Sequence, residues 1–192
     1  LGPFGYIRPE LSFGGFDRDG RFEQGMVGLR TIYFSNLYRL RRTSFRQFFT
    51  FDYTIGVRRF DDEFININDD NGIRGLSNVF LRGTKRMTLN SETVAFTPLY
   101  VLGFRLAMYG FLDFALVNDE TDKLLKNTLY QGYGIGFRFR NENLAFNTIQ
   151  IRVAWYPNVP TGVSNFDFDL SGASSLRIAD FRVVEPAPLV FD

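Results

Sequence analysis

Residues 44–59 read SFRQFFTFDYTIGVRR, and apolar and polar side chains alternate along this stretch. The alternate positions from Phe45 to Val57 are nearly all apolar, whereas those from Arg46 to Arg58 are nearly all polar or small. A period of two predicts a β-strand with one apolar face and one polar face. The strand is about 15 residues long, well above the usual ~5–6 residues of a globular strand.

Similar alternation predicts seven further strands, with antiparallel neighbours joined by short links. The predicted strands cover residues 4–15, 22–35, 85–97, 103–116, 129–140, 147–156 and 164–171. The first two alternate less clearly, and Pro9 suits an edge strand or a bulge. No segment has the period of an amphipathic helix, so the sequence predicts an all-β fold of eight antiparallel strands.

The composition narrows the class of protein. Of the 192 residues, 45 % are hydrophobic, which is too many for a disordered segment. The absence of Cys and His removes thiolate metal sites, the usual general base and the commonest metal ligand. We therefore predict no catalytic residues, no metal and no cofactor, and a net charge of +1 gives no reason to expect a nucleic-acid partner. Because the chain starts at Leu1 without a signal peptide, we expect a mature or truncated fragment.

Two barrel architectures fit long two-faced strands. A soluble lipocalin-like barrel turns its apolar face inward, whereas an outer-membrane barrel turns it toward lipid. Nine charged residues fall on the polar face: Arg46, Asp52, Arg86, Glu92, Arg105, Asp113, Arg138, Arg140 and Arg152. So many charges are too costly to bury in a small dry core, but they can line a watery lumen. The pattern favours a transmembrane β-barrel over a soluble barrel or β-sandwich.

The lengths of the links indicate which end of the strands lies outside. Short links are expected at residues 96–101 and 140–145, and long ones at 60–84 and 118–127. Outer-membrane barrels have short periplasmic turns and longer external loops, so 60–84 and 118–127 are assigned to the outside. The link at 36–43 is rather long for an inner turn. Trp155 and Tyr156 are predicted to lie in an aromatic girdle at the outer interface.

Three motifs occur in order between residues 73 and 113. They are Ile73-Arg74-Gly75-Leu76 in the longest link, Leu89-Asn90-Ser91-Glu92 in the next strand and Phe111-Leu112-Asp113 in the strand after that. With these motifs, residues 44–171 resemble the C-terminal half of the barrel of BamA-type outer-membrane assembly factors, the bacterial surface antigen family. The family's loop motif is (V/I)-R-G-(F/Y), so Leu76 departs from the usual aromatic residue.

The resemblance implies a structure for the motif loop. It implies a barrel of 16 strands, of which residues 1–172 supply the last eight, with a C-terminal extension at 173–192. In the family, the motif loop folds back into the lumen and its Arg packs against the inner wall. Because Glu92, Phe111 and Asp113 share the polar face, we expect Arg74 to pair with both carboxylates and to stack on the ring.

The resemblance also implies a function. Family members insert barrel proteins into the outer membrane of Gram-negative bacteria or pass polypeptides across it, without enzymatic activity. The implied partners are outer-membrane lipid, unfolded outer-membrane proteins and accessory lipoproteins. A weakly closed seam at the short last strand, residues 164–171, would offer an edge to an incoming strand. The alternatives are a passive porin-like channel and the membrane-anchor barrel of a fusion protein.

Overall fold

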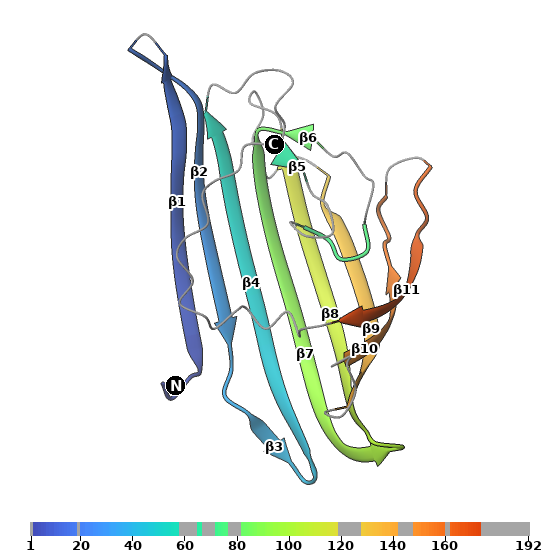
Figure 1. Ribbon diagram of the computed structural model, residues 1–192. Helices are drawn as coiled ribbons and strands as arrows, with labels where there is room; N and C mark the ends of the chain where they lie inside the picture. The colour runs from blue at the N-terminus through green and yellow to red at the C-terminus, as the bar shows by residue number, and fades with distance from the viewer. Residues whose placement is uncertain are drawn as a thin grey trace.

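The computed structural model describes residues 2–18, 20–57, 65–66, 72–76, 82–118, 128–141, 148–159 and 162–173. A single antiparallel sheet of nine strands dominates this part of the chain (Figure 1). Its strands are β1 (Tyr6–Arg18), β2 (Arg21–Phe34), β3 (Tyr38–Leu40), β4 (Thr43–Val57), β7 (Lys85–Val101), β8 (Phe104–Asn118), β9 (Tyr130–Arg140), β10 (Thr148–Trp155) and β11 (Phe166–Ala173). The predicted all-β antiparallel fold is therefore confirmed.

The strands follow chain order in the sheet, β1-β2-β4-β7-β8-β9-β10-β11, and β3 pairs with the start of β4. These eight strands of the main path match the eight predicted segments, and β3 is an addition. A separate two-stranded sheet, β5 (Ile65–Asn66) and β6 (Arg82–Gly83), lies within the predicted long link. Within the described residues the sheet does not close, because β1 and β11 are its two edges. The extension at 173–192 lies outside the described residues, apart from Ala173 at the end of β11.

The predicted loop at residues 96–101 is wrong, because β7 continues to Val101. The turn to β8 consists of Leu102 and Gly103, both with positive φ. A register shift between Phe96 and Tyr100 interrupts the pairing with β8. Such a bulge tolerates a proline, which has no N–H to donate to the ladder, and Pro98 lies inside it.

The link at residues 36–43 is mostly a hairpin. β3 pairs with the first residues of β4, with Leu40 opposite Thr43, so the turn is only Arg41 and Arg42. Pro9 lies in β1, an edge strand, as its missing N–H requires. The predicted links at 118–127 and 140–145 fall mostly outside the described part of the chain.

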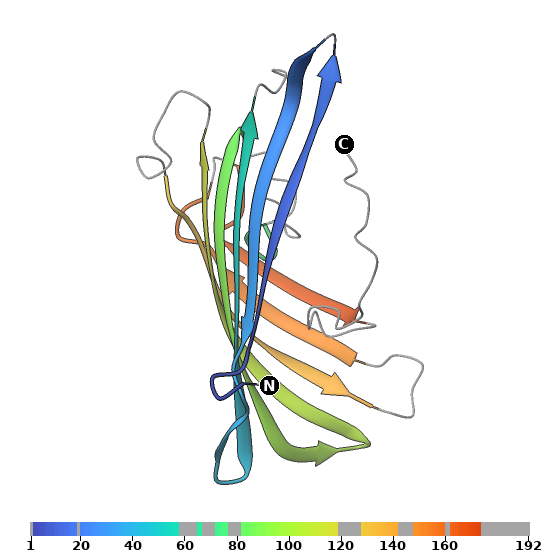
Figure 2. The ribbon, with the colours of Figure 1, turned by 90° about the vertical axis from the view of Figure 1, so that its left-hand side faces the viewer.

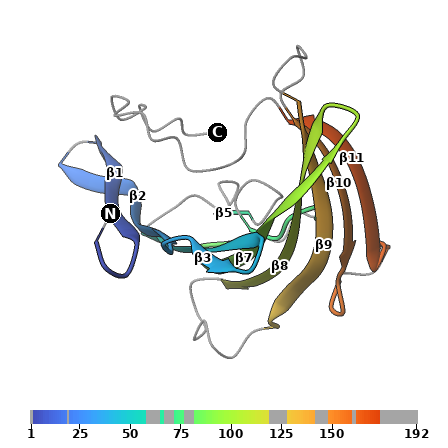
Figure 3. The ribbon, with the colours of Figure 1, turned by 90° about the horizontal axis from the view of Figure 1, so that it is seen from below.

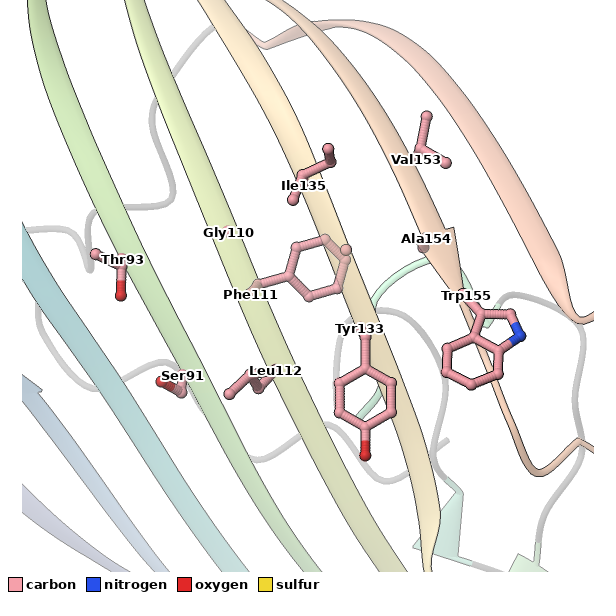
Figure 4. A pocket seen from close by; sticks show the side chains of 11 residues that line it. Ser91, Thr93, Gly110, Phe111, Leu112, Tyr133, Ile135, Val153, Ala154 and Trp155 are labelled. Atoms are coloured by element: carbon pink, nitrogen blue, oxygen red, sulfur yellow. The ribbon is translucent and has the colours of Figure 1, made fainter.

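The sheet is strongly curved (Figures 2 and 3). Its two faces differ in the side chains that they carry. The convex face carries exposed apolar side chains such as Phe49 at 39 %, Ile135 at 64 % and Phe168 at 67 %. On β8, β9 and β10, Leu112, Tyr133, Ile135 and Trp155 surround an open hollow at Gly110 (Figure 4). The concave face holds the buried Asp113 and Arg152. The alternation in the sequence therefore corresponds to two sides of one curved wall.

Three glycines of β9 receive bulky side chains on the concave face. A Cβ at Gly134 would stand 2.3 Å from the ring of Phe111, and one at Gly136 would stand 2.5 Å from the ring of Tyr109. A Cβ at Gly132 would stand 2.6 Å from Ile73. Of these three glycines, Gly132 makes room for Ile73 of the motif loop, whereas the other two accommodate rings from β8.

Replacing Gly134 by Ala should destabilise the fold, because the new methyl group overlaps the Phe111 ring and overpacking costs about 1–3 kcal/mol. Gly110→Ala is the matched control, since its Cβ would meet only the carbonyl of Gly134 at 3.8 Å. Denaturant unfolding followed by the fluorescence of Trp155, the single tryptophan, measures both variants. Equal stability of the two variants would contradict this packing.

Candidate functional site

The motif segment, residues 72–76, lies against the concave face of the sheet (Figure 3). Ile73 and Leu76 are 0 % and 2 % exposed, and the N–H of Leu76 donates to the carbonyl of Ile73 at 3.2 Å, which closes a tight turn. Their side chains join a buried cluster with Tyr156, just after β10, and with residues of β7, β8 and β10: Val94, Tyr109, Phe111, Ala115, Val117 and Ala154. Burial of these two apolar side chains presses the segment onto the wall.

Arg74, between them, contacts all three predicted wall residues. Its Nε donates to Oδ2 of Asp113 at 3.1 Å and its Nη2 donates to Oδ1 at 3.1 Å. The backbone N–H of Arg74 donates to Oδ2 of the same carboxylate at 3.0 Å. Nη1 donates to Oε2 of Glu92, and the guanidinium carbon lies 4.5 Å from the centre of the Phe111 ring. A two-pronged ion pair of this kind fixes the angle as well as the position of the guanidinium.

Glu92 is shared between two arginines. Nη1 and Nη2 of Arg138 donate to its two carboxylate oxygens at 2.6 and 3.2 Å. Arg138 also stacks on Tyr109, with 3.9 Å from the guanidinium carbon to the ring centre, and donates from Nε to Gln150 at 3.0 Å. The carboxylate that faces Arg74 is thus held in place from the opposite side, which pre-organises the pocket before the segment enters it.

Tyr156 fastens the other side of the segment. Its hydroxyl donates to the carbonyl of Arg74 at 2.7 Å, and its side chain is 1 % exposed. Gly75 has a φ of +79°, and a Cβ there would stand 2.2 Å from the Tyr156 hydroxyl and 2.5 Å from a carboxylate oxygen of Asp167. Only glycine suits both the left-handed backbone and this close approach. The segment therefore reaches from Glu92 on β7 to Asp167 on β11.

The electrostatics hold Arg74 in its charged form. Burial by itself lowers the pKa of this guanidinium, but the charges of Asp113 and Glu92 outweigh that effect and raise the pKa above its ordinary value. The Asp113 side chain is 0 % exposed and those of Glu92 and Arg74 are 13 % and 17 % exposed. Removing either partner would leave an uncompensated buried charge, which is far more costly than losing a surface ion pair.

The structure brings all seven predicted site residues together: Ile73, Arg74, Gly75, Leu76, Glu92, Phe111 and Asp113. It also adds Tyr156, Arg138 and Asn90, whose Nδ2 donates to the carbonyl of Gly72 at 2.7 Å. The prediction that Tyr156 lies in an aromatic girdle is wrong, because this side chain is buried on the concave side of the sheet. Trp155 is 45 % exposed. The sequence contains the signal, since Tyr156 has the same parity as Arg152 and Ala154. The functional role of the site stays a prediction.

The site is built to hold a segment of chain. Its polar groups are guanidinium, carboxylate, amide and phenol, and most of their hydrogen bonds join the segment to the wall. No group of three His, Cys, Asp or Glu side chains in the described ranges could hold a metal ion. The described residues also include no helix long and apolar enough to cross a membrane.

Comparisons with protein-family models, with curated proteins and with solved structures found no match to this chain. The case for a function therefore depends on the geometry of the site and on the chemistry of the two faces.

Asp113→Asn should release the segment, because breaking one side of a buried ion pair costs about 3–5 kcal/mol. Trypsin cuts after arginine, so opening of the segment exposes the bond between Arg74 and Gly75. We expect cleavage at this bond to accelerate by roughly 10²-fold or more when cleavage tracks the open population. Mass spectrometry of fragments that begin at Gly75 measures it.

Glu10→Gln is the control, because Glu10 pairs with Arg8 at 2.7 Å but is 44 % exposed. An exposed pair contributes only about 0–1 kcal/mol, so cleavage after Arg74 should stay at the wild-type rate. Unchanged cleavage in Asp113→Asn would show that Asp113 does not hold the segment.

Proposed function

We propose that this chain forms part of an outer-membrane β-barrel of the BamA or bacterial surface antigen type. The proposed barrel has 16 strands, eight of them from this chain, and lies in the outer membrane of a Gram-negative bacterium. Its proposed task is to insert barrel proteins into that membrane or to pass polypeptides across it. Its partners would be outer-membrane lipid, unfolded barrel proteins and accessory lipoproteins.

The convex face supports contact with lipid. Apolar side chains are exposed along its whole width, from Leu11 on β1 at 83 % to Leu170 on β11 at 65 %. So continuous an apolar surface is unusual for a protein that stays in water. β1, β2, β4, β7, β8 and β9 have 11–17 residues each. A tilted strand needs about 9–11 residues to cross a bilayer.

The concave face supports a hydrated interior. Charged side chains on β4, β7, β9, β10 and β11 pair there across the sheet: Arg86 with Asp52 at 3.3 Å, Arg138 with Glu92 at 2.6 Å and Arg152 with Asp167 at 3.1 Å. Partial exposure of these groups fits a lumen that contains water as well as a segment of chain.

The seated motif segment is the observation that carries the proposal. Porins keep a water-filled channel, whereas other outer-membrane barrels are plugged by loops. Here a buried bidentate ion pair and a tyrosine hold the segment on the concave face. The segment joins β7 and β8 to β10 and β11, so it can stabilise one edge of an open sheet. An edge that is held without being closed by a partner strand can accept an incoming strand.

The test uses the full-length protein that contains this chain, reconstituted in vesicles with an unfolded outer-membrane barrel as client. We expect the wild type to accelerate folding of the client, measured by the gel mobility of unheated samples. Arg74→Ala and Asp113→Ala should each fall toward the rate of empty vesicles, because the segment is no longer held. Glu10→Gln is the control and should keep the wild-type rate.

Wild-type acceleration in both Ala variants would contradict the role of the segment. Steady ion conductance in planar bilayers, with no acceleration of client folding by the wild type, would favour the porin-like channel. A chain that enters vesicles but shows neither activity would favour the membrane anchor of a fusion protein.

A further inference from the structure

The lower end of the sheet in Figure 1 is basic. Residues 35–51, 93–112 and 133–141 form the lower parts of β3, β4, β7, β8 and β9. These three stretches contain neither Asp nor Glu, but they contain seven arginines: Arg39, Arg41, Arg42, Arg46, Arg105, Arg138 and Arg140. Of the seven, Arg138 alone forms an ion pair with a described carboxylate. Arginines that have no described carboxylate partner make these parts of the sheet complementary to an anionic surface.

The tips of the two lower hairpins are also apolar. Around the β3–β4 turn, Leu37, Tyr38 and Leu40 are 53–67 % exposed. Around the β7–β8 turn, Tyr100 is 64 % exposed and Leu102 is 92 % exposed. Leu40 lies opposite Thr43 and Tyr38 opposite Phe45, so the apolar side chains of β3 continue the apolar face of β4. The apolar convex face thus extends down to the arginines.

Each tip contains a residue in a costly backbone conformation. Arg41 has a φ of +55° and Leu102 a φ of +50°. The left-handed region costs a non-glycine residue roughly 1–2 kcal/mol, and two-residue hairpin turns normally use Gly or Asn there. An exposed non-glycine residue in this strained backbone conformation indicates that its side chain has a function other than stabilising the fold. The two residues have different chemistry, one basic and one apolar, and both face solvent.

From the basic end, the exposed apolar tips and these two turn residues, we infer that the lower hairpins bind the headgroup layer of an anionic phospholipid membrane. Arg41 and Arg42 pair with lipid phosphates, while Tyr38, Val101 and Leu102 enter the boundary between headgroups and acyl chains. Val101 is 60 % exposed and lies opposite Phe104, so its side chain is on the convex face. Arginine suits phosphate because its fork of donors matches the phosphate oxygens. Tyrosine is favoured at this depth because its ring is apolar and its hydroxyl is polar. This inference rests on the proposed membrane barrel and names the lipid class that its lower rim selects.

A lipid surface fits these tips better than a protein partner does. The apolar and basic groups stand on two hairpins at one edge of a face already assigned to lipid, and they continue that face without a break. No described residue near the tips provides an acidic group that would be complementary to a basic protein. The arrangement of a long apolar band ending in tyrosine and arginine is that of a membrane boundary.

The test compares insertion of the full-length protein that contains this chain into vesicles of phosphatidylcholine alone and of phosphatidylcholine mixed with phosphatidylglycerol, at low salt. Protease protection measures the rate of insertion, and the ratio of the two rates gives the preference for anionic lipid. Each arginine near an anionic surface contributes about a fivefold preference. The double variant Arg41→Gly with Arg42→Ser should therefore lose roughly 30-fold of the wild-type ratio. Gly is the residue that the backbone at position 41 favours, so the variant keeps the turn.

The matched control is Arg18→Gln with Arg21→Gln, which removes the same charge beside the turn between β1 and β2 at the opposite end. We expect it to keep the wild-type ratio. An unchanged ratio in the lower-hairpin variant, or an equal loss in the control, would overturn the inference and favour a protein partner or bulk charge. Equal insertion of the wild type into both kinds of vesicle also overturns the inference, but it does not contradict the proposed membrane barrel. A wild type that enters neither kind contradicts the proposed barrel itself.

Discussion

The ion pair between Arg74 and Asp113 is the contact on which the concave face is organised. A buried carboxylate with 0 % side-chain exposure needs a cation, and the two-pronged geometry together with the backbone N–H of Arg74 satisfies it. Glu92 then balances both Arg74 and Arg138. The rings of Phe111 and Tyr109 lie flat enough to stack on these guanidinium groups because glycines of β9 leave space for them.

The same contact links the interior to the edge of the sheet. Because the segment is held by β8 at one side and by Tyr156 at the other, its position depends on the mutual arrangement of β7, β8, β10 and β11. Asn165 completes the connection, since its backbone carbonyl accepts from the N–H of Tyr156 and its side chain donates to the carbonyl of Tyr156, both at 2.8 Å. The segment is therefore attached through Tyr156 to the β10–β11 hairpin as well as to the wall.

The strands could be predicted from the sequence because their side chains alternate strictly, and parity placed Glu92, Phe111 and Asp113 on one face. The position of Arg74 among them followed from a resemblance, since parity says nothing about a loop. Three features were missed. The bulge near Pro98 interrupts pairing without changing composition, the Arg41–Arg42 turn lacks the usual glycine, and Tyr156 lies just past the end of β10, where parity is easily overlooked. Closure of the sheet into a barrel stays a prediction, because β1 and β11 are the two edges of the sheet within the described residues.

The central claim is that the convex face meets lipid and the concave face meets water. The chain has no cysteine, so single cysteines carrying a nitroxide label can be placed at successive positions of β9 and β10 in the reconstituted full-length protein. Collision with oxygen, which dissolves in lipid, should peak at Ile135, Phe137, Ile151 and Val153. Collision with a water-soluble nickel chelate should peak at the intervening Arg138 and Gln150. A profile without this period of two, or one with the two reagents exchanged, would contradict the account.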